Sequence, residues 1–104
     1  MADKLWIVVT TVEKESQGRE LARAGVESGR AACAQLEAPM TSFYIWKGDL
    51  QESREFRLVF KVSASKAKAL IEWLRARHPY EVPEIVAWEA SAGNPAYLKW
   101  IEEA

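Results

Sequence analysis

The chain has 104 residues, 49% of them hydrophobic and 28% charged, which is typical of one globular domain and excludes a disordered chain. Its formal net charge is -1 with acidic and basic residues interspersed, so neither a nucleic acid nor an anionic membrane is expected as a partner. The first apolar run, residues 5–9, is too short to span a bilayer. We predict a single domain over residues 1–104. The lone cysteine, Cys33, cannot form an internal disulfide and predicts a cytoplasmic location.

Strand and helix patterns alternate in the first third of the chain. Residues 4–10 form a short apolar run typical of a buried strand. Residues 13–28 carry small and apolar side chains at helical spacing, and Gly29 follows as a stop. Residues 31–36 are ambiguous, because their alanines favour a helix while Pro39 leaves room for only a short segment.

A hairpin is predicted in the middle of the chain. Residues 41–46 are rich in Thr and aromatic side chains, and residues 47–49 (Lys-Gly-Asp) are typical of a tight turn. Residues 55–62 alternate apolar and polar side chains, as expected for a strand with one buried face.

A second helix, a strand and a third helix complete the predicted elements. Ser65 is expected to cap the second helix, which must end near His78 because Pro79 disfavours helix in the residue before it. Residues 84–89 predict a strand. Asn94, followed by a proline, predicts the start of a short C-terminal helix.

This order of elements predicts an α+β fold of the ferredoxin-like split βαβ type. An antiparallel sheet would carry both main helices on one face and leave the other face bare. The chain has five Trp, three Tyr and three Phe, a large aromatic content for one small domain. These rings either fill a Trp-rich core, or lie at an interface where a partner subunit covers the bare face, or line a pocket.

Few residues offer catalytic chemistry, so we predict that the protein is not an enzyme and needs no cofactor. The glycines form no phosphate-binding loop, and no serine lies in a nucleophile motif. Cys33 and His78 form the one conceivable nucleophile pair, although a cysteine between alanines is also typical of a core. The same two side chains, with Glu84 or Glu81 adding an oxygen, are candidate ligands for copper or zinc. The alternative is that His78 simply terminates a helix.

Residues 78–84, His-Pro-Tyr-Glu-Val-Pro-Glu, form a turn stiffened by two prolines. This segment is either a rigid binding wall or a structural connection. It resembles the signature of the CutA family of divalent-cation tolerance proteins. Further segments resemble that family in order along nearly the whole chain: residues 8–11 (Val-Val-Thr-Thr), 30–34 (Arg-Ala-Ala-Cys-Ala), 42–48 (Ser-Phe-Tyr-Ile-Trp-Lys-Gly) and 93–100 (Gly-Asn-Pro-Ala-Tyr-Leu-Lys-Trp).

The resemblance implies a homotrimer, similar in architecture to the PII signalling proteins, whose long hairpin extends across neighbouring subunits. It also implies that residues 31–36 are a strand. Family positions associated with copper correspond here to Thr10, Arg77 and His78, of which only His78 is a copper ligand. The resemblance further implies a cleft between subunits lined by residues including Arg30, Tyr44, Trp46, Lys61 and Tyr80.

Three functions follow from these observations. The first is a trimeric divalent-metal (copper) response protein that binds metal at most weakly, through His78 with Cys33 or Glu84. The second is a PII-like sensor whose Arg30 and Lys61 meet a small anion between walls formed by Tyr44, Trp46 and Tyr80. The third is an adaptor trimer without a small ligand.

Overall fold

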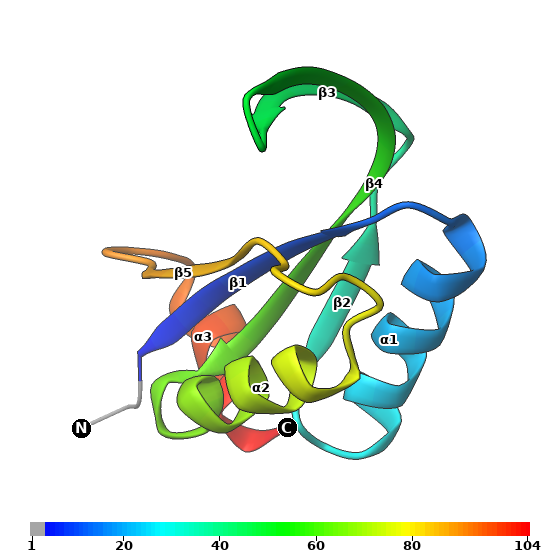
Figure 1. The fold of residues 1–104 in the computed structure, drawn as a ribbon. Coiled ribbons are helices and arrows are strands. Elements are labelled where there is room, and N and C mark those ends of the chain that lie inside the picture. The colour runs from blue at the N-terminus through cyan, green and yellow to red at the C-terminus, as the bar shows by residue number, and fades with distance from the viewer. Residues whose placement is uncertain (1–3) are drawn as a thin grey trace.

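The computed structural model describes residues 4–104, so residues 1–3 of the predicted domain lie outside the described residues. The chain alternates strands and helices in the order expected for a split βαβ arrangement (Figure 1). The elements are β1 (Leu5–Val12), α1 (Glu15–Glu27), β2 (Cys33–Leu36), β3 (Met40–Trp46), β4 (Asp49–Ser63), α2 (Ala64–Arg77), β5 (Ile85–Glu89) and α3 (Pro95–Glu103). The predicted α+β class and ferredoxin-like fold are confirmed.

The strand β4 organises the sheet because it has different partners along its length. Its second half lies between β2 and β1 in the order β2-β4-β1-β5, and all these pairs are antiparallel. Its first half pairs only with β3. The change occurs between Phe56, which pairs with Val12 of β1, and Glu55, which pairs with Met40 of β3. Residues 40–55, here called the hairpin arm, therefore leave the main sheet and curl away from it (Figure 1).

The arm ends in a two-residue turn. Lys47 and Gly48 both have positive φ angles, 51° and 85°, the combination that favours a tight hairpin between twisted strands. Trp46 and Asp49 form the last strand pair beside this turn. The predicted hairpin is confirmed, but β4 begins at Asp49 rather than at Glu55, because the arm's polar residues pair with β3 and need no buried face.

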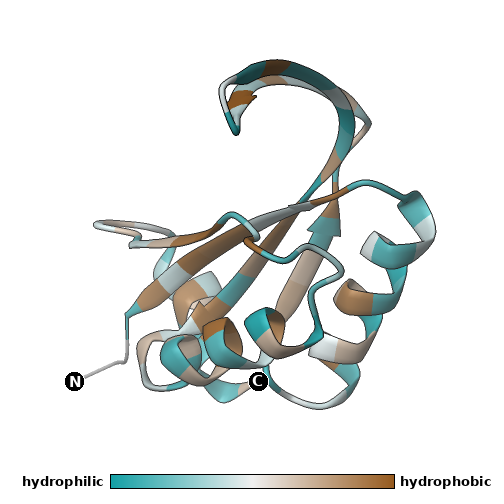
Figure 2. Ribbon diagram, viewed as in Figure 1, coloured by the Kyte–Doolittle hydropathy of each residue, from teal (hydrophilic) through white to brown (hydrophobic). Residues whose placement is uncertain are grey.

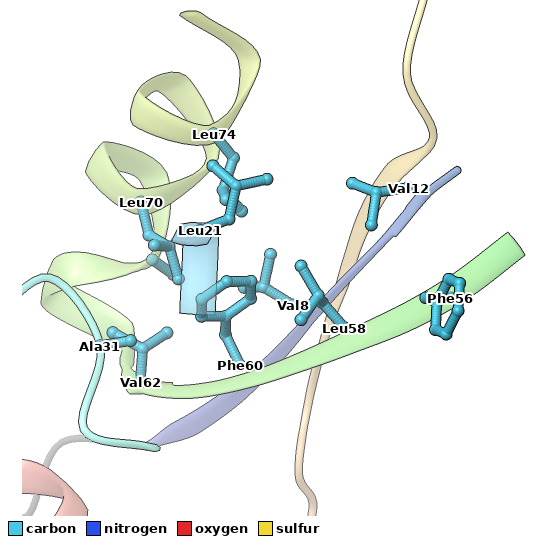
Figure 3. Packing of buried hydrophobic residues seen from close by; sticks show 11 residues of the cluster. Val8, Val12, Leu21, Ala31, Phe56, Leu58, Phe60, Val62, Leu70 and Leu74 are labelled. Carbon is cyan, nitrogen blue, oxygen red and sulfur yellow. The ribbon is translucent and has the colours of Figure 1, made fainter. Parts of the chain in front are cut away.

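The hydrophobic core lies between the sheet and the helices α1 and α2. Alternate β4 side chains, including the fully buried Leu58 and Phe60, point toward these helices. Leu70 and Leu74 of α2 approach them from the helix side, and Leu21 of α1 completes the contact (Figure 3). Gly18 and Gly25 are buried on α1, and a side chain at Gly25 would meet the Phe60 ring, so small residues let this helix approach the sheet closely.

The opposite face of the sheet, here called the outer face, is only partly covered. The helix α3 lies on this side and buries Ile101 against it (Figure 1). The expectation of a wholly bare face is therefore wrong. Trp88 of β5 and Trp100 of α3 nevertheless remain exposed, as does Trp46 of the arm, whereas Trp6 and Trp73 pack against the core. The aromatic content thus serves both the core and the surface.

The helix ends follow local sequence signals with one exception. Asn94 caps α3 as predicted, since its side-chain oxygen accepts a hydrogen bond of 3.1 Å from the Ala96 amide. His78 ends α2 in an extended conformation before Pro79, also as predicted. The N-cap of α2 is Ser63 rather than Ser65, so the predicted cap is wrong by two residues. No helix among residues 4–104 is long and apolar enough to cross a membrane.

Candidate functional site

A cleft of about 1160 Å³ lies where the hairpin arm curls over the end of β1 and the loop 78–84. Aromatic rings from two separate parts of the chain line it. Phe43, Tyr44 and Trp46 come from β3, and Tyr80 comes from the loop after α2. This combination of concave shape and aromatic walls is typical of a ligand site.

The charge lining the cleft is predominantly negative. Its lining includes five carboxylates and only two basic side chains, Lys14 and Arg54. The carboxylates are Glu13, Glu52, Glu55, Glu81 and Glu84. A concave surface lined by one sign of charge attracts small ions of the opposite sign, so this cleft favours cations over anions.

A hydrogen-bonded clasp built on His78 holds one wall of the cleft. The Nε2 atom of His78 lies 2.9 Å from both the carbonyl oxygen of Thr11 and the hydroxyl of Thr10 in β1. The Thr10 hydroxyl in turn donates a 2.7 Å hydrogen bond to the carbonyl oxygen of Glu84. The Nδ1 atom of His78 accepts a hydrogen bond of 3.1 Å from the Tyr80 amide. Both ends of the loop 78–84 are thereby tied to β1.

These partners define the protonation of the His78 ring. A carbonyl oxygen can only accept, so Nε2 carries the proton that it donates to Thr11. Because Nδ1 accepts from the Tyr80 amide, it carries none, and the ring is neutral. Burial lowers the pKa of His78, although the Thr11 carbonyl and the Glu55 carboxylate act in the opposite direction. The resulting imidazole has no free lone pair to offer a metal ion.

Tyr80 joins the loop to the hairpin arm. Its hydroxyl donates a 2.8 Å hydrogen bond to Oε2 of Glu55, the residue at which β4 leaves the main sheet. A hydroxyl paired with a carboxylate forms a short, charge-assisted bond. Burial and this bond raise the pKa of Tyr80 well above its usual range, so the phenol stays protonated and remains a donor.

The three predicted metal ligands do not converge within one chain. His78 contacts Thr10, whose side chain lies on the helix-covered face of the sheet. Cys33 pairs with Lys61, which pairs with Ile7, so it lies on the outer face and about 10 Å from Thr10 along the strand direction. Glu84 contacts Thr10 through its backbone oxygen. No group of three or more His, Cys, Asp or Glu side chains among residues 4–104 is arranged to hold a metal ion.

The predicted cleft residues separate into two groups. Tyr44, Trp46 and Tyr80 line the same cleft. Lys61 lies on the outer face, where its Nζ donates a 2.8 Å hydrogen bond to Gln35 and lies 5.9 Å from the Tyr97 ring centre. Arg30 follows α1 and stacks over Trp73 at 5.4 Å. The two cations expected to meet an anion are therefore absent from the cleft lining.

The sequence patterns did not single out Glu55 as a site residue, and Thr10 was named only through the family resemblance, as a position associated with copper. Glu55 is the first residue of the alternating run that predicted the second hairpin strand. In the structure the same residue is where the partner of β4 changes from β1 to β3. Thr10 interrupts an otherwise apolar strand, yet it is fully buried. A polar side chain buried in a strand usually has a hydrogen-bond partner, and that rule offered a signal for the clasp.

Comparison with known proteins places nearly the whole chain in one family. The family model described as CutA1 divalent ion tolerance protein matches residues 6–104. A curated relative, the divalent-cation tolerance protein CutA of Thermus thermophilus, is 40% identical over 93% of this chain and 94% of its own length. Protein CutA of Mus musculus is 42% identical over 89% of this chain. The match covers 52% of that mouse protein, so the chain spans about half the length of this relative.

Solved structures share the fold over nearly the same extent. CutA from Xylella fastidiosa superposes with a TM-score of 0.93 at 31% identity, covering 96% of each chain. CutA1 from Oryza sativa superposes with a TM-score of 0.93 at 32% identity, covering 98% of this chain and 94% of its own. On the strength of its sequence and its fold, the chain belongs to the CutA1 family of divalent ion tolerance proteins.

Proposed function

We propose that this chain is a homotrimeric divalent-cation response protein that attracts cations to the cleft weakly, and that it acts by binding rather than by catalysis. The observation that carries the proposal is the charge of the cleft, five carboxylates against two basic groups. The family description, divalent ion tolerance, agrees with a site that selects positive ions. The cytoplasmic location stays a prediction, and cell fractionation would test it.

The chemistry of the cleft supports weak and unselective cation binding. Carboxylate oxygens suit hard cations such as Mg²⁺ and Ca²⁺, whereas copper prefers imidazole and thiolate ligands. Both nitrogens of His78 are already hydrogen-bonded, and Cys33 lies on the other face of the sheet. We therefore expect copper to bind this chain no more tightly than carboxylates alone allow.

The hairpin arm supports the trimer. Phe43, Ile45 and Leu50 are 65%, 66% and 70% exposed in the single chain, and Figure 2 shows hydrophobic bands along the arm. Such apolar surface on a projecting element is typical of a protein–protein interface. Light scattering is expected to give a mass about three times that of the 11.8 kDa chain. A monomer mass in dilute buffer would contradict the trimer.

A titration with Mg²⁺ and Cu²⁺, followed by Trp emission, tests the cation site. Trp46 lines the cleft, so the Trp emission of the chain is expected to change as the cation binds, with a Kd of about 10⁻⁴ M. The Trp46→Phe variant is expected not to show this change. Glu55→Gln with Glu84→Gln is expected to weaken binding several-fold. The matched control, Glu20→Gln with Glu102→Gln, removes two exposed carboxylates away from the cleft and is expected to bind as the wild type does.

Two outcomes would overturn this assignment. Equal binding by the cleft variant and the control variant would show that the cleft carboxylates are not the site. An unchanged emission throughout the titration, together with an unchanged melting temperature, would remove cation binding altogether, since a ligand of the native state raises that temperature. Thermal shift with small anions would then test the sensor alternative, and the absence of any shift would leave the adaptor alternative. The placement of Arg30 and Lys61 outside the cleft gives the anion alternative no support within one chain.

A further inference from the structure

We propose that His78 and Tyr80 are positioning residues that set the direction in which the hairpin arm leaves the sheet. A relay of hydrogen bonds runs from β1 through His78 and Tyr80 to Glu55 on β4. The proposal concerns the shape of a single chain and therefore goes beyond the cation function. It rests on the proposed function in one respect: an arm held in one direction could meet a neighbouring subunit in a trimer.

The position of Glu55 makes it a hinge residue. Beyond it, toward the arm tip, β4 no longer pairs with β1, because β1 ends at Val12 opposite Phe56. On the other edge of β4, β2 ends at Leu36 and β3 begins at Met40, with Pro39 between them. Proline has no amide hydrogen to donate to a ladder, so the neighbouring strand is interrupted at the same level. At this point β4 loses its pairing with β1, while on its other edge β3 takes the place of β2 and pairs with Glu55 through Met40.

The backbone of β4 does not explain the curl of the arm. Residues 49–63 contain no glycine and no proline, the residues that usually mark sharp bends in strands. Their φ angles are all negative, since the positive values among residues 4–104 fall at Gly29, Lys47 and Gly48. Beyond the hinge, β4 has only β3 beside it, and a two-stranded ribbon can twist over a wide range of angles.

On the neighbouring edge Glu37 bonds to Arg57 and Met40 pairs with Glu55. Residues 38 and 39 therefore stand opposite Phe56 alone, and this extra residue adds a local bend. A side-chain tie outside the ladder would narrow the directions that remain open to the arm.

The Tyr80 hydroxyl provides that tie at the hinge itself. It binds Oε2 of Glu55 at 2.8 Å, and the bond is partly buried. A tie fixes a direction only if its other end is rigid, and the His78 clasp supplies this rigidity. The Nδ1 of His78 holds the Tyr80 amide, and its Nε2 is anchored to Thr11, which pairs with Arg57 of β4 in the main sheet. The rings of His78 and Tyr80 also pack together, with centres 4.9 Å apart.

The relay can be tested by measuring the distance between the arm tip and α1. Spin labels would be attached at Lys47→Cys and Glu20→Cys in a Cys33→Ser chain, refolded with a large excess of unlabelled chain so that only distances within one chain are seen. The parent chain is expected to give one narrow distance distribution. Tyr80→Phe, which removes only the hydroxyl, is expected to broaden this distribution and shift its mean.

Matched variants separate the relay from a general structural effect. Glu55→Gln keeps an oxygen that accepts from Tyr80 and is expected to retain the narrow distribution, whereas Glu55→Leu is expected to reproduce the Tyr80→Phe result. His78→Leu is expected to give the same shift, because it removes both the anchor and the amide acceptor. Combining Tyr80→Phe with Glu55→Leu is expected to add nothing further, since both changes break the same bond.

The result that overturns the proposal is a parent-like distribution in Tyr80→Phe. A parent-like distribution in a folded His78→Leu chain would likewise remove His78 from the relay. A melting temperature for the core, followed by circular dichroism, establishes that each variant is folded. Thr10→Val weakens the clasp without changing the ring, because it removes one of the two contacts of His78 Nε2 and the donor to Glu84, while the Thr11 carbonyl still holds the ring; a smaller shift than in His78→Leu is expected.

Discussion

The two halves of β4 are one continuous strand, yet they lie in opposite environments. In the half that pairs with β1 and β2, alternate side chains such as Leu58 and Phe60 are fully buried beneath the helices. In the half that pairs with β3, Leu50 is 70% exposed. The arm half carries one large apolar side chain, Leu50, among polar residues, and the rest of the chain does not cover it. The half beneath the helices is buried by the chain itself, whereas the arm half has no such cover within the chain.

Stability is expected to reside in the buried half of β4 and not in the arm. Removing a buried side chain from the sheet half should destabilise the chain at every protein concentration. Removing an exposed apolar side chain from the arm should act only through association, because a side chain that contacts water in both the folded and the unfolded chain adds little to folding. Substitutions in the two halves therefore differ both in size and in their dependence on concentration.

The largest effect is expected for Phe60→Ala. This ring is fully buried and contacts the α1 surface at Gly25, so its loss leaves a cavity as well as removing buried apolar area. The free energy of unfolding is expected to fall by about 3–5 kcal/mol. Urea denaturation at two protein concentrations would measure it. A loss below about 1 kcal/mol would show that the core collapses into the space.

A smaller and concentration-dependent effect is expected for Ile45→Ser in the arm. If a neighbouring subunit covers this side chain, the change weakens association by about 1.5–3 kcal/mol per buried copy and lowers the mass seen by light scattering at low concentration. Val26→Ser, at an exposed position on α1, serves as the control and should leave the mass unchanged. An Ile45→Ser chain with a parent-like mass at all concentrations would place the interface elsewhere.

A pH-dependent effect of moderate size is expected from His78, the single histidine in the chain. Burial lowers its pKa in the folded chain, so the unfolded chain binds the proton more readily. Its contribution to stability is fully present above about pH 6.5 and decreases as the pH falls below that value. Thermal unfolding of the parent and of His78→Asn between about pH 5.5 and 7.5 should differ in slope, the variant being flatter. Parallel slopes would contradict this account.

The smallest effect is expected for Arg23→Gln on the exposed surface of α1. Arg23 and Glu27 form a 2.7 Å ion pair one helical turn apart, with both side chains in solvent. Such pairs contribute about 0.3–0.5 kcal/mol, and salt screens them. A melting temperature within a degree or two of the parent is expected at physiological salt, and a larger loss would mean that α1 depends on its surface charges.

The sequence predicted the parts of the fold that follow from local patterns. Alternation between residues 55 and 62 predicted the buried half of β4, Pro79 predicted the end of α2, and Asn94 predicted the start of α3. The arm half of β4 was not predicted, because residues 49–54 carry mostly polar side chains and become a strand only by pairing with β3. The α3 cover of the outer face was also missed, since no local pattern reports which face a helix contacts.

The candidate site was predicted in part for the same reason. Tyr44, Trp46 and Tyr80 were expected together and do line one cleft. The clasp was not predicted, because it joins His78 to residues 67 and 68 positions earlier in the chain. Contacts of that separation depend on the sheet register, and a one-residue change of register would move Thr10 to the other face. The residue types indicated a kind of ligand, whereas the fold determines which of these side chains lie close together.

The tight turn at Lys47 and Gly48 also has a consequence for the order of folding. It places every β3–β4 pair within a short stretch of chain, so the arm closes only small loops and can form in about 1–10 µs. The β1–β5 pairing, in contrast, joins residues as distant as Trp6 and Glu89 and closes most of the chain in one step. Because such long loops are slow to close, we expect the β1–β5 pairing to limit the folding rate. The arm is expected to form and unfold many times before that step.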